Sequence, residues 1–362
     1  MTYSAFFNGL QYRTGYCLIC EGIEKAFFSG HLWTDTPQNR EDTMKKILLA
    51  AAVAVTAPSI AMADCGEVSI TEMNWDSSAV VTYVAKFLME QGYGCSVTTV
   101  PSATVTSLAS VAETGTPDIV TELWINGTPA YGELSDAGRI VTLGDVLSDG
   151  GVEGWWIPTY LVDEHPELAT LEGVQANADL LGNRFHNCPD GWGCRNTNAA
   201  LTEAAELEAN GFEIFQHGSG ETMAASIAAA FENREPWLGY YWAPTSVLGE
   251  YDMTMVDLGP YNEEVHMCNS NPECEAVGLS SYPVGPVKTI VTTTFQEEFP
   301  EVSELMANVS FTNLQMGELL AWKEANNASA EEAAVYFISN NSDVWSTWLN
   351  DEARGNLAAL IQ

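Results

Sequence analysis

Apolar and polar residues follow one another in blocks that predict strands and helices in alternation. Short apolar or β-branched runs predict strands over 68–71, 97–100 and 118–121, and a helical period covers 79–90. We expect further strands over 138–141, as a short edge run, 153–158 and 287–293, and further helices over 198–210, 221–233 and 303–307. The tail from 314 to 360 is helical and amphipathic in pattern. Such alternation predicts an α/β protein with mostly parallel sheets.

The N-terminal region predicts an export signal that does not start at the first residue. Residues 1–43 show no clear period, and we interpret them as upstream sequence from an early start. Residues 44–63 combine a basic start, an apolar run over 47–55 and a small-x-small cleavage site, Ala61-Met62-Ala63. The apolar run is too short to span a bilayer. We therefore expect a Sec-type signal peptide over 44–63 and a periplasmic mature protein.

The charge of the chain excludes several partners. The 13 basic and 49 acidic residues give a formal net charge of −36, and since five of each precede Asp64, 8 basic and 44 acidic residues remain in the mature part. Nucleic acid and anionic membrane surfaces are therefore poor partners. The composition favours solubility in a salty medium.

Six cysteines follow the predicted signal, and an even number in an oxidising compartment predicts three disulfides. Cys188 with Cys194 and Cys268 with Cys274 would each close a short loop. Cys65 and Cys95 open two strands around one helix, and a βαβ unit would place them side by side. Zinc is the alternative for clustered cysteines, but the mature part has no CxxC pair or neighbouring His set.

Four tryptophans stand at the ends of short runs or in turn-rich loops. Trp75 and Trp124 end apolar runs, Trp192 lies in the loop Cys-Pro-Asp-Gly-Trp-Gly-Cys over 188–194, and Trp242 precedes Ala243-Pro244. Rings at such tips can converge into one box whose faces attract a cation, and methylated ammonium groups are the usual ligands. For any single ring, an ordinary core position is the alternative.

These motifs carry a resemblance to a known family. Val120-Thr121-Glu122-Leu123-Trp124, the 188–194 loop and Tyr240-Tyr241-Trp242 resemble the substrate-binding proteins of glycine betaine/proline betaine ABC importers, and most closely the trimethylamine N-oxide-binding proteins of marine bacteria. The resemblance implies a two-lobed periplasmic binding protein of type II-like fold, each lobe a mostly parallel sheet flanked by helices, with the ligand in the cleft. It implies lobe I over 64–150 plus 286–362 and lobe II over 151–285, closing by hinge motion.

The resemblance also implies ligand-binding residues. Trp124, Trp192 and Trp242 match cage positions of the family, and Trp75 with Asp76 matches the tip of its first strand. Gly193 would offer its amide beside Trp192. Where glycine betaine binders have a histidine one turn after the Trp124 position, this chain has Thr128, which weakens the case for a carboxylate ligand.

Glu153 and Trp155 add an acid and a ring to the expected strand over 153–158. Period-two alternation places these two side chains on one face and Trp156 on the other, and which of the two rings faces the ligand is left open. A carboxylate in the cage wall would attract trimethylammonium and repel a betaine carboxylate. A solvated strand end is the equal alternative for Glu153.

Other chemistry is weakly indicated. No nucleophile or metal motif accompanies His186 or His217, which we interpret as loop or hydrogen-bonding residues. The loop over 261–274 offers oxygens that calcium prefers, but it lacks EF-hand spacing and a solvated acidic loop is favoured. The weak calcium candidates are Asn262, Glu263, Asn269 and Glu273.

The sequence therefore predicts a monomeric solute receptor, not an enzyme, without a cofactor, that delivers trimethylamine N-oxide to a membrane ABC permease. Glycine betaine, choline and sulfonium analogues are alternative ligands. A periplasmic enzyme acting on a methylated amine is the alternative from another class, and it would need a base or cofactor site beside the cage. A chemotaxis or signalling receptor lacks a fused partner segment here.

Overall fold

The computed structural model describes residues 65–361, so the predicted upstream segment and signal peptide lie outside the described residues. Its strands are β1 (Gly66–Met73), β2 (Cys95–Ser102), β3 (Ile119–Trp124), β4 (Ile140–Pro158), β5 (Arg184–Asn187), β6 (Glu213–Gln216), β7 (Gly239–Ala243), β8 (Met253–Met255) and β9 (Gly285–Thr292). They follow the order β2-β1-β3-β9-β4-β7-β5-β6, and β8 pairs with β4.

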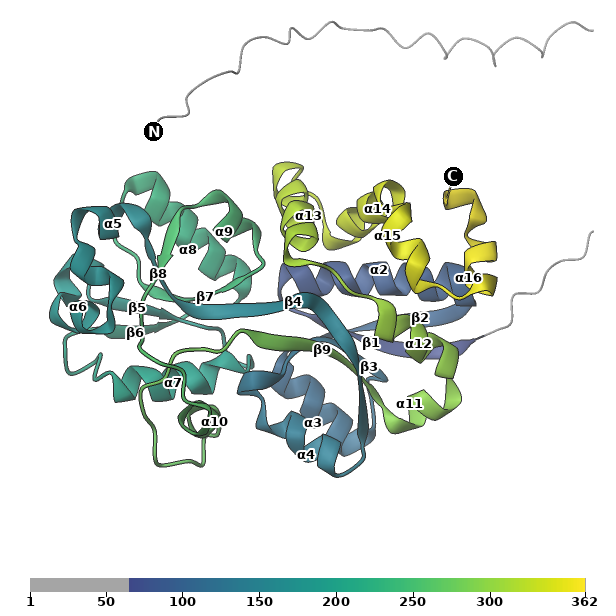
Figure 1. Ribbon diagram of the computed structural model, residues 1–362, viewed down its shortest axis with the longest axis horizontal. Coiled ribbons are helices and arrows are strands. Elements are labelled where there is room, and N and C mark those ends of the chain that lie inside the picture. The colour runs from purple at the N-terminus through teal and green to yellow at the C-terminus, as the bar shows by residue number, and fades with distance from the viewer. Residues whose placement is uncertain (1–64, 362) are drawn as a thin grey trace, which may run out of the picture. The chain divides into compact units, whose positions relative to one another are not determined.

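Helices cover both faces of the strands in each lobe (Figure 1). The α-helices are α2 (Asp76–Tyr93), α3 (Thr104–Thr114), α4 (Pro129–Asp136), α5 (Thr159–Glu164), α6 (Leu171–Ala176), α7 (Cys194–Ala204), α8 (Gly220–Asn233), α9 (Ser246–Glu250), α10 (Glu263–Ser270), α11 (Thr293–Glu298), α12 (Pro300–Asn308), α13 (Asn313–Ala325), α14 (Ala330–Asn340), α15 (Ser342–Trp345) and α16 (Asp351–Asn356). Short 3₁₀ turns are η1 (Ile125–Gly127), η2 (Pro166–Ala169), η3 (Ala178–Leu181), η4 (Ser346–Trp348) and η5 (Ala358–Leu360). Within this part of the chain, no helix has the length and apolar character that a bilayer crossing requires.

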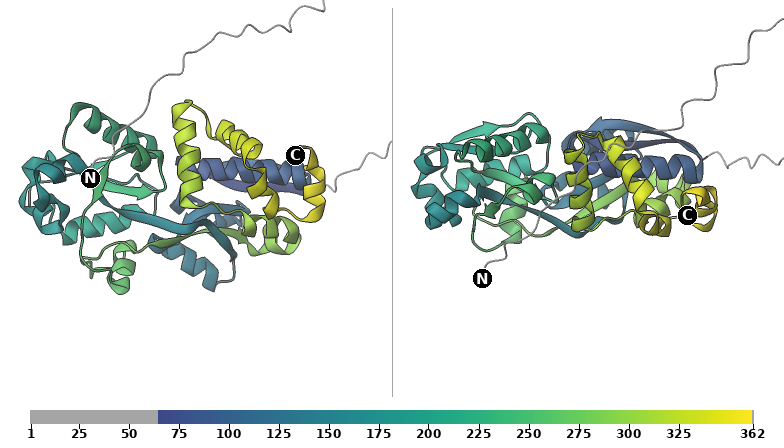
Figure 2. Two further views of the ribbon diagram at one scale, coloured as in Figure 1. Left: turned by 45° about the horizontal axis from the view of Figure 1, so that its top comes forward. Right: turned by 90° about the horizontal axis from the view of Figure 1, so that it is seen from above.

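The two lobes are joined by the strands β4 and β9, which run between them (Figure 2). Parallel pairs β1–β2 and β1–β3 lie in one lobe, and β5–β6 and β5–β7 lie in the other. Every antiparallel pair involves β4 or β9. The expected two-lobed α/β fold is confirmed.

The long strand β4 corrects one prediction. Separate strands were expected over 138–141 and 153–158, the first at an edge, but β4 runs unbroken from Ile140 to Pro158 with β9 on one side and β7 on the other. The glycine-rich middle, Gly150-Gly151, interrupted the apolar pattern without ending the strand. Gly151 pairs with Gly285 at the point where the expected lobe boundaries fall, and the division itself stays a prediction.

Two apolar clusters stabilise the lobes. One packs α2 and the C-terminal helices α12 to α16 against β1, β3 and β9, with Ile70, Val84 and Phe337 among its members. The other fills the second lobe around Trp155 and Phe185 and continues through the tryptophans into the first lobe, where it includes Leu108 of α3 and Leu134 of α4. The structure contains the predicted disulfides Cys65–Cys95, Cys188–Cys194 and Cys268–Cys274. The first joins the starts of β1 and β2, as the βαβ argument required.

Candidate functional site

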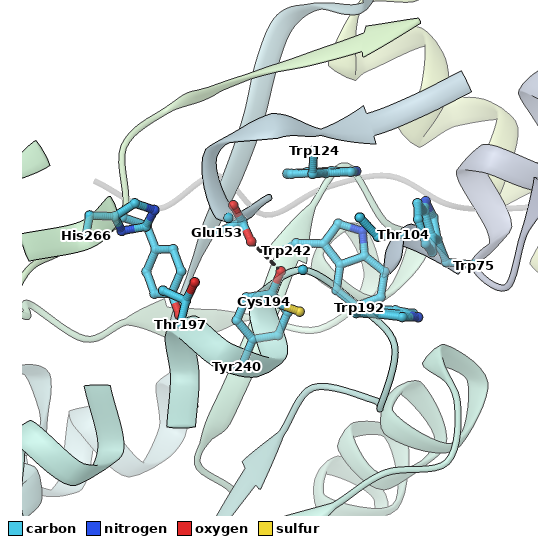
Figure 3. A pocket seen from close by; sticks show the side chains of 13 residues that line it. Trp75, Thr104, Trp124, Glu153, Trp192, Cys194, Thr197, Tyr240, Trp242 and His266 are labelled. Atoms are coloured by element: carbon cyan, nitrogen blue, oxygen red, sulfur yellow. Dashed lines mark hydrogen bonds between the residues drawn. The ribbon is translucent and has the colours of Figure 1, made fainter. Parts of the chain in front are cut away.

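The four tryptophans at strand and loop tips converge on one cavity. Trp75, Trp124, Trp192 and Trp242 all line it, and Figure 3 shows their rings grouped at one end. Trp192 meets both Trp75 and Trp242 edge to face, with ring centroids 5.1 and 4.9 Å apart. The cavity is small, about 30 Å³, on a measure by which one water needs roughly 10–15 Å³. Ring faces around so small a space could hold a compact methylated cation.

Both lobes supply walls of the cavity and contact each other around it. In one lobe, Trp75 lies between β1 and α2 and Trp124 ends β3. In the other lobe, Trp192 comes from the loop before α7 and Trp242 from β7. The indole of Trp192 donates to Asn74 Oδ1 across the cleft at 2.8 Å. The backbone amide of Val105 donates to the carbonyl of Gly191 at 3.0 Å. The position of Trp192 therefore depends on the approach of the two lobes.

The close approach of Trp124 to β4 explains why glycine stands at Gly151. A Cβ added there would lie 2.9 Å from Cε3 of Trp124 and nearer still to two other atoms of the ring. No larger residue fits while the ring keeps its place. The strand β4, which joins the lobes, therefore also contacts the Trp124 ring and limits where it can lie.

Glu153 lies in the cavity wall with Tyr240. The hydroxyl of Tyr240 donates to Glu153 Oε1 at 2.7 Å (Figure 3). Burial raises the pKa of Glu153 to about 7, and the hydrogen bond from Tyr240 works against that rise. Near neutral pH this side chain can therefore be charged or neutral, and a bound cation would favour the charged form.

Two of the predicted site residues, Trp155 and Asp76, do not line this cavity. Trp155 is fully buried in the second lobe, where its indole donates to Asn198 Oδ1 at 2.8 Å. It does not line this cavity, and a contact with the ligand stays a prediction. Trp156 does not line the cavity either, and its indole donates to the carbonyl of Tyr241. Glu153 and Trp155 do lie on one face of the strand, as the period-two alternation predicts. That face lines the cavity at Glu153 but packs into the core of the lobe at Trp155.

Asp76 also lies outside this cavity. It lines a neighbouring cavity of about 390 Å³ that shares Trp75 and Trp242, and it forms an ion pair with Lys323 at 3.0 Å. Its carboxylate is thus already paired. Gly193, by contrast, does line the candidate cavity.

A polar end of the cavity was missed by sequence reasoning. It contains Thr197 from α7 and His266 from α10, and both pack on η1, the turn after Trp124. Thr197 Oγ1 and His266 Nε2 are buried and have no hydrogen-bond partner. Burial lowers the pKa of His266, while a hydrogen bond with the backbone of Asn126 raises it. The Thr197 hydroxyl can donate to an oxygen of a ligand, whereas Nε2 of a neutral His266 bonded to the Asn126 backbone can only accept.

The other missed lining residues complete this description. They are Thr104, Gly127, Cys194, Tyr240 and Tyr282. The hydroxyl of Tyr282 donates to the same Asn198 Oδ1 as Trp155, so Trp155 supports the cavity wall from behind. The sequence signal that could have found Tyr240 is its place two residues before Trp242, on the same face of β7.

Two of the four weak calcium candidates use their side-chain oxygens in hydrogen bonds within the protein. Asn262 Oδ1 caps α10 by accepting from the amide of Val265, and Asn269 Oδ1 accepts from the amide of Gly278. Glu263 and Glu273 are exposed. Between residues 65 and 361 no three His, Cys, Asp or Glu side chains gather as a metal site would need. The calcium expectation stays a prediction.

His186 and His217 form a hydrogen-bonded pair outside the cavity. Nδ1 of His186 lies 2.8 Å from Nε2 of His217, and the His186 ring stacks on Trp237. Burial lowers the pKa of His186 to about 3 and that of His217 to about 4. Both rings are therefore neutral hydrogen-bonding groups at neutral pH.

Comparisons with known proteins agree with this architecture. Residues 66–340 match the family described as the substrate binding domain of ABC-type glycine betaine transport system. The chain is 23% identical over 323 residues to the trimethylamine N-oxide-binding protein of Pelagibacter ubique (strain HTCC1062), a match that covers 84% of this chain and 99% of the relative.

Solved structures share the fold. The glycine betaine/L-proline-binding protein ProX of Borrelia burgdorferi is 18% identical with a TM-score of 0.67, covering 80% of this chain and 99% of its own. An ABC-transporter choline-binding protein in complex with choline is 18% identical with a TM-score of 0.65, covering 82% and 98%. The chain therefore belongs to the family of substrate-binding domains of ABC-type glycine betaine transport systems, which bind small quaternary ammonium ligands outside the cytoplasm for an ABC transporter.

Proposed function

We propose that this protein captures trimethylamine N-oxide between its lobes and delivers it to the membrane permease of an ABC importer. The observation that carries the proposal is the convergence of four tryptophans and one carboxyl group, Glu153, on a cavity of about 30 Å³. The trimethylammonium face would lie against the rings, and a desolvated contact of this kind contributes about 2 kcal/mol. The relative from Pelagibacter ubique, named for the same ligand, adds support.

The polar end of the cavity would receive the oxygen of the ligand. The N-oxide oxygen is bonded directly to nitrogen, so a single donor beside the cage could satisfy it, and the Thr197 hydroxyl is such a donor. The role of His266 follows from its protonation. A neutral ring bonded to the Asn126 backbone would accept through Nε2, and a protonated ring would donate.

Glycine betaine is the second candidate, and His266 favours it in the protonated form, in which Nε2 would donate to the betaine carboxylate. The departure at Thr128 weakened the case for a carboxylate ligand, yet α10 brings a histidine into the cavity from another element. The amide of Gly193 at the start of α7 is a further donor that a carboxylate could use. Against this ligand stand the small volume and the nearby carboxyl group of Glu153.

Calorimetric titration against trimethylamine N-oxide, glycine betaine, choline and a sulfonium analogue tests the proposal. We expect the N-oxide to bind most tightly. Thr197→Val should weaken N-oxide binding, and His266→Ala should weaken glycine betaine binding more. Thr202→Val on the same helix serves as the matched control, because the Thr202 hydroxyl donates to the carbonyl of Ala199 and does not line the cavity. Tighter binding of glycine betaine by the parent protein would overturn the ligand assignment.

A binding role and an enzymatic role are separated by recovery of the ligand. We infer binding without catalysis, because the lining groups of the cavity suit recognition and the family acts in transport. Prolonged incubation followed by quantitative recovery of unchanged ligand is the expected result. A stoichiometric or catalytic loss of methyl groups or of the oxygen would contradict it.

A further inference from the structure

Glu122 is a carboxyl group inside a buried strand, directly before the cage strand ends. The pairing of β3 with β9 slips between Val120 and Leu123, and Glu122 has φ of 52°, in the left-handed region that few non-glycine residues adopt. A bulge of this kind re-aims a side chain. Here the carboxyl group turns toward Trp75, which follows the neighbouring strand β1 and precedes α2, and it is fully shielded from solvent.

The carboxyl group of Glu122 holds the cage from behind. Its Oε1 accepts from the indole Nε1 of Trp75 at 2.6 Å and from the Ser77 hydroxyl at 2.7 Å. Its Oε2 is buried and has no partner of good geometry. Trp75 and Trp124, the two rings contributed by this lobe, both lie beside this carboxyl group.

We propose that Glu122 is a positioning residue and buried counter-charge of the cage, which orients the Trp75 ring and adds negative charge behind it for a cationic ligand. The inference rests on the proposed function only in requiring that the ligand carry a positively charged methylated ammonium group. A charge-assisted N–H···O⁻ bond is about twice as strong as a neutral one and polarises the indole. More electron density on the ring face strengthens its attraction for a cation.

The charge surroundings of Glu122 give the sign of the pH effect. Burial raises its pKa to about 7, while hydrogen bonds from Ser77, Trp75 and Trp124 oppose the rise. The nearest charged groups on packed elements are paired: Asp76 on α2 with Lys323, and Lys288 on β9 with Asp145. Glu153 faces the same cage from the other lobe. A bound cation favours the ionised form, so it should lower the pKa of Glu122 and bind more tightly as pH rises through 7.

The hydrogen bond can be tested without any ligand. In the ¹⁵N-labelled protein, the indole Nε1–H resonance of Trp75, assigned with Trp75→Phe, should shift as Glu122 ionises near pH 7. Glu122→Gln should abolish that titration. A resonance that is unchanged between pH 5.5 and 8.5, or that titrates in the same way in the variant, would overturn the inference even if every ligand bound as expected.

The counter-charge is tested with tetramethylammonium and trimethylamine N-oxide as probes. The ratio of the Kd of Glu122→Gln to that of the parent should be near one at pH 5.5 and at least tenfold at pH 8.5, with Glu72→Gln on β1 as the matched control. Because burial of the charge destabilises the empty protein above its pKa, Glu122→Gln should keep or raise Tm at pH 8. A ratio independent of pH would refute the counter-charge.

If Glu122→Gln does not fold, the parent protein still decides the matter. Saturating tetramethylammonium should move the midpoint of the Trp75 titration to lower pH, and an unmoved midpoint in a saturated sample would contradict the inference. If neither probe binds, the proposed function fails, while the ligand-free Trp75 titration still confirms or refutes the hydrogen bond.

Discussion

The contact between Gly151 and the Trp124 ring offers a sharp test of the aromatic box, because the ring can be displaced without replacing any of the four tryptophans. In Gly151→Ala, the new Cβ would fall 2.9 Å from Cε3 of Trp124 and closer to two other ring atoms. To regain ordinary contact at 3.5–4.0 Å, the nearest ring atoms must retreat by more than about 1 Å. Loss of a well-placed cation–π contact costs about 2 kcal/mol, which corresponds to roughly a 30-fold rise in Kd.

The expected result is a 10- to 30-fold weaker binding of trimethylamine N-oxide by calorimetry, with native circular dichroism. Overpacking should cost about 1–3 kcal/mol of folding free energy, so the fold survives. Gly132→Ala is the matched control, since a Cβ on that helical glycine of α4 meets nothing within 4 Å.

A double-mutant cycle separates displacement of the ring from a general effect on the hinge strand. If Gly151→Ala acts through Trp124, adding it to Trp124→Ala should cost little more than Trp124→Ala alone. Additive losses, or parent-like affinity in Gly151→Ala, would refute the reasoning that β4 seats this ring.

Three further predictions follow from the site. Trp242→Ala should weaken trimethylammonium binding by about 1–2 kcal/mol or more while circular dichroism stays native, and unchanged affinity in a folded variant would contradict the aromatic box. Reduction of the Cys188–Cys194 disulfide should loosen its loop and lower the affinity for the ligand, because that loop carries Trp192 and Gly193. Non-reducing peptide mapping checks the pairing, and Cys188 linked to another cysteine would count against it. Glu153 has a pKa raised to about 7 and must ionise to attract a trimethylammonium group. The affinity for the N-oxide should therefore rise with pH from 6 to 8, and it should rise less steeply in Glu153→Gln. Parallel pH profiles of the parent and the variant would exclude an electrostatic role of Glu153.

The sequence could predict that the four tryptophans converge on one cavity, because each is marked by a local pattern. Each of the four tryptophans ends a short run or lies in a tight loop, and in an α/β fold such ends meet at the same cleft. The short disulfide loops followed from spacing, and the Cys65–Cys95 pair followed from one βαβ unit. These inferences needed only the order of elements and the direction of strands.

What the sequence could not predict depends on long-range placement. His266 reaches the cavity on α10, which is separated in sequence from every tryptophan of the cage, and nothing local marks its target. The burial of Trp155 in the lobe core could not be predicted, because a strand that passes from cavity wall into core keeps its period-two alternation while its surroundings change. Glu122 was hidden by a bulge, since an acid in an apolar strand pattern gives no sign of the direction in which its side chain turns.

The two buried carboxyl groups give the empty protein a cost that a cation could remove. Glu122 in one lobe and Glu153 in the other both have a pKa raised to about 7, mainly by burial. A carboxyl pKa raised by folding means that stability falls as pH rises from about 4.5 to about 7. In the proposed complex, a trimethylammonium group between them offsets that cost only when both lobes contribute their walls, as the Trp192–Asn74 contact allows. Preference for a trimethylammonium group and closure of the lobes would then have one electrostatic cause, and a ligand of the same shape without that positive group would gain neither.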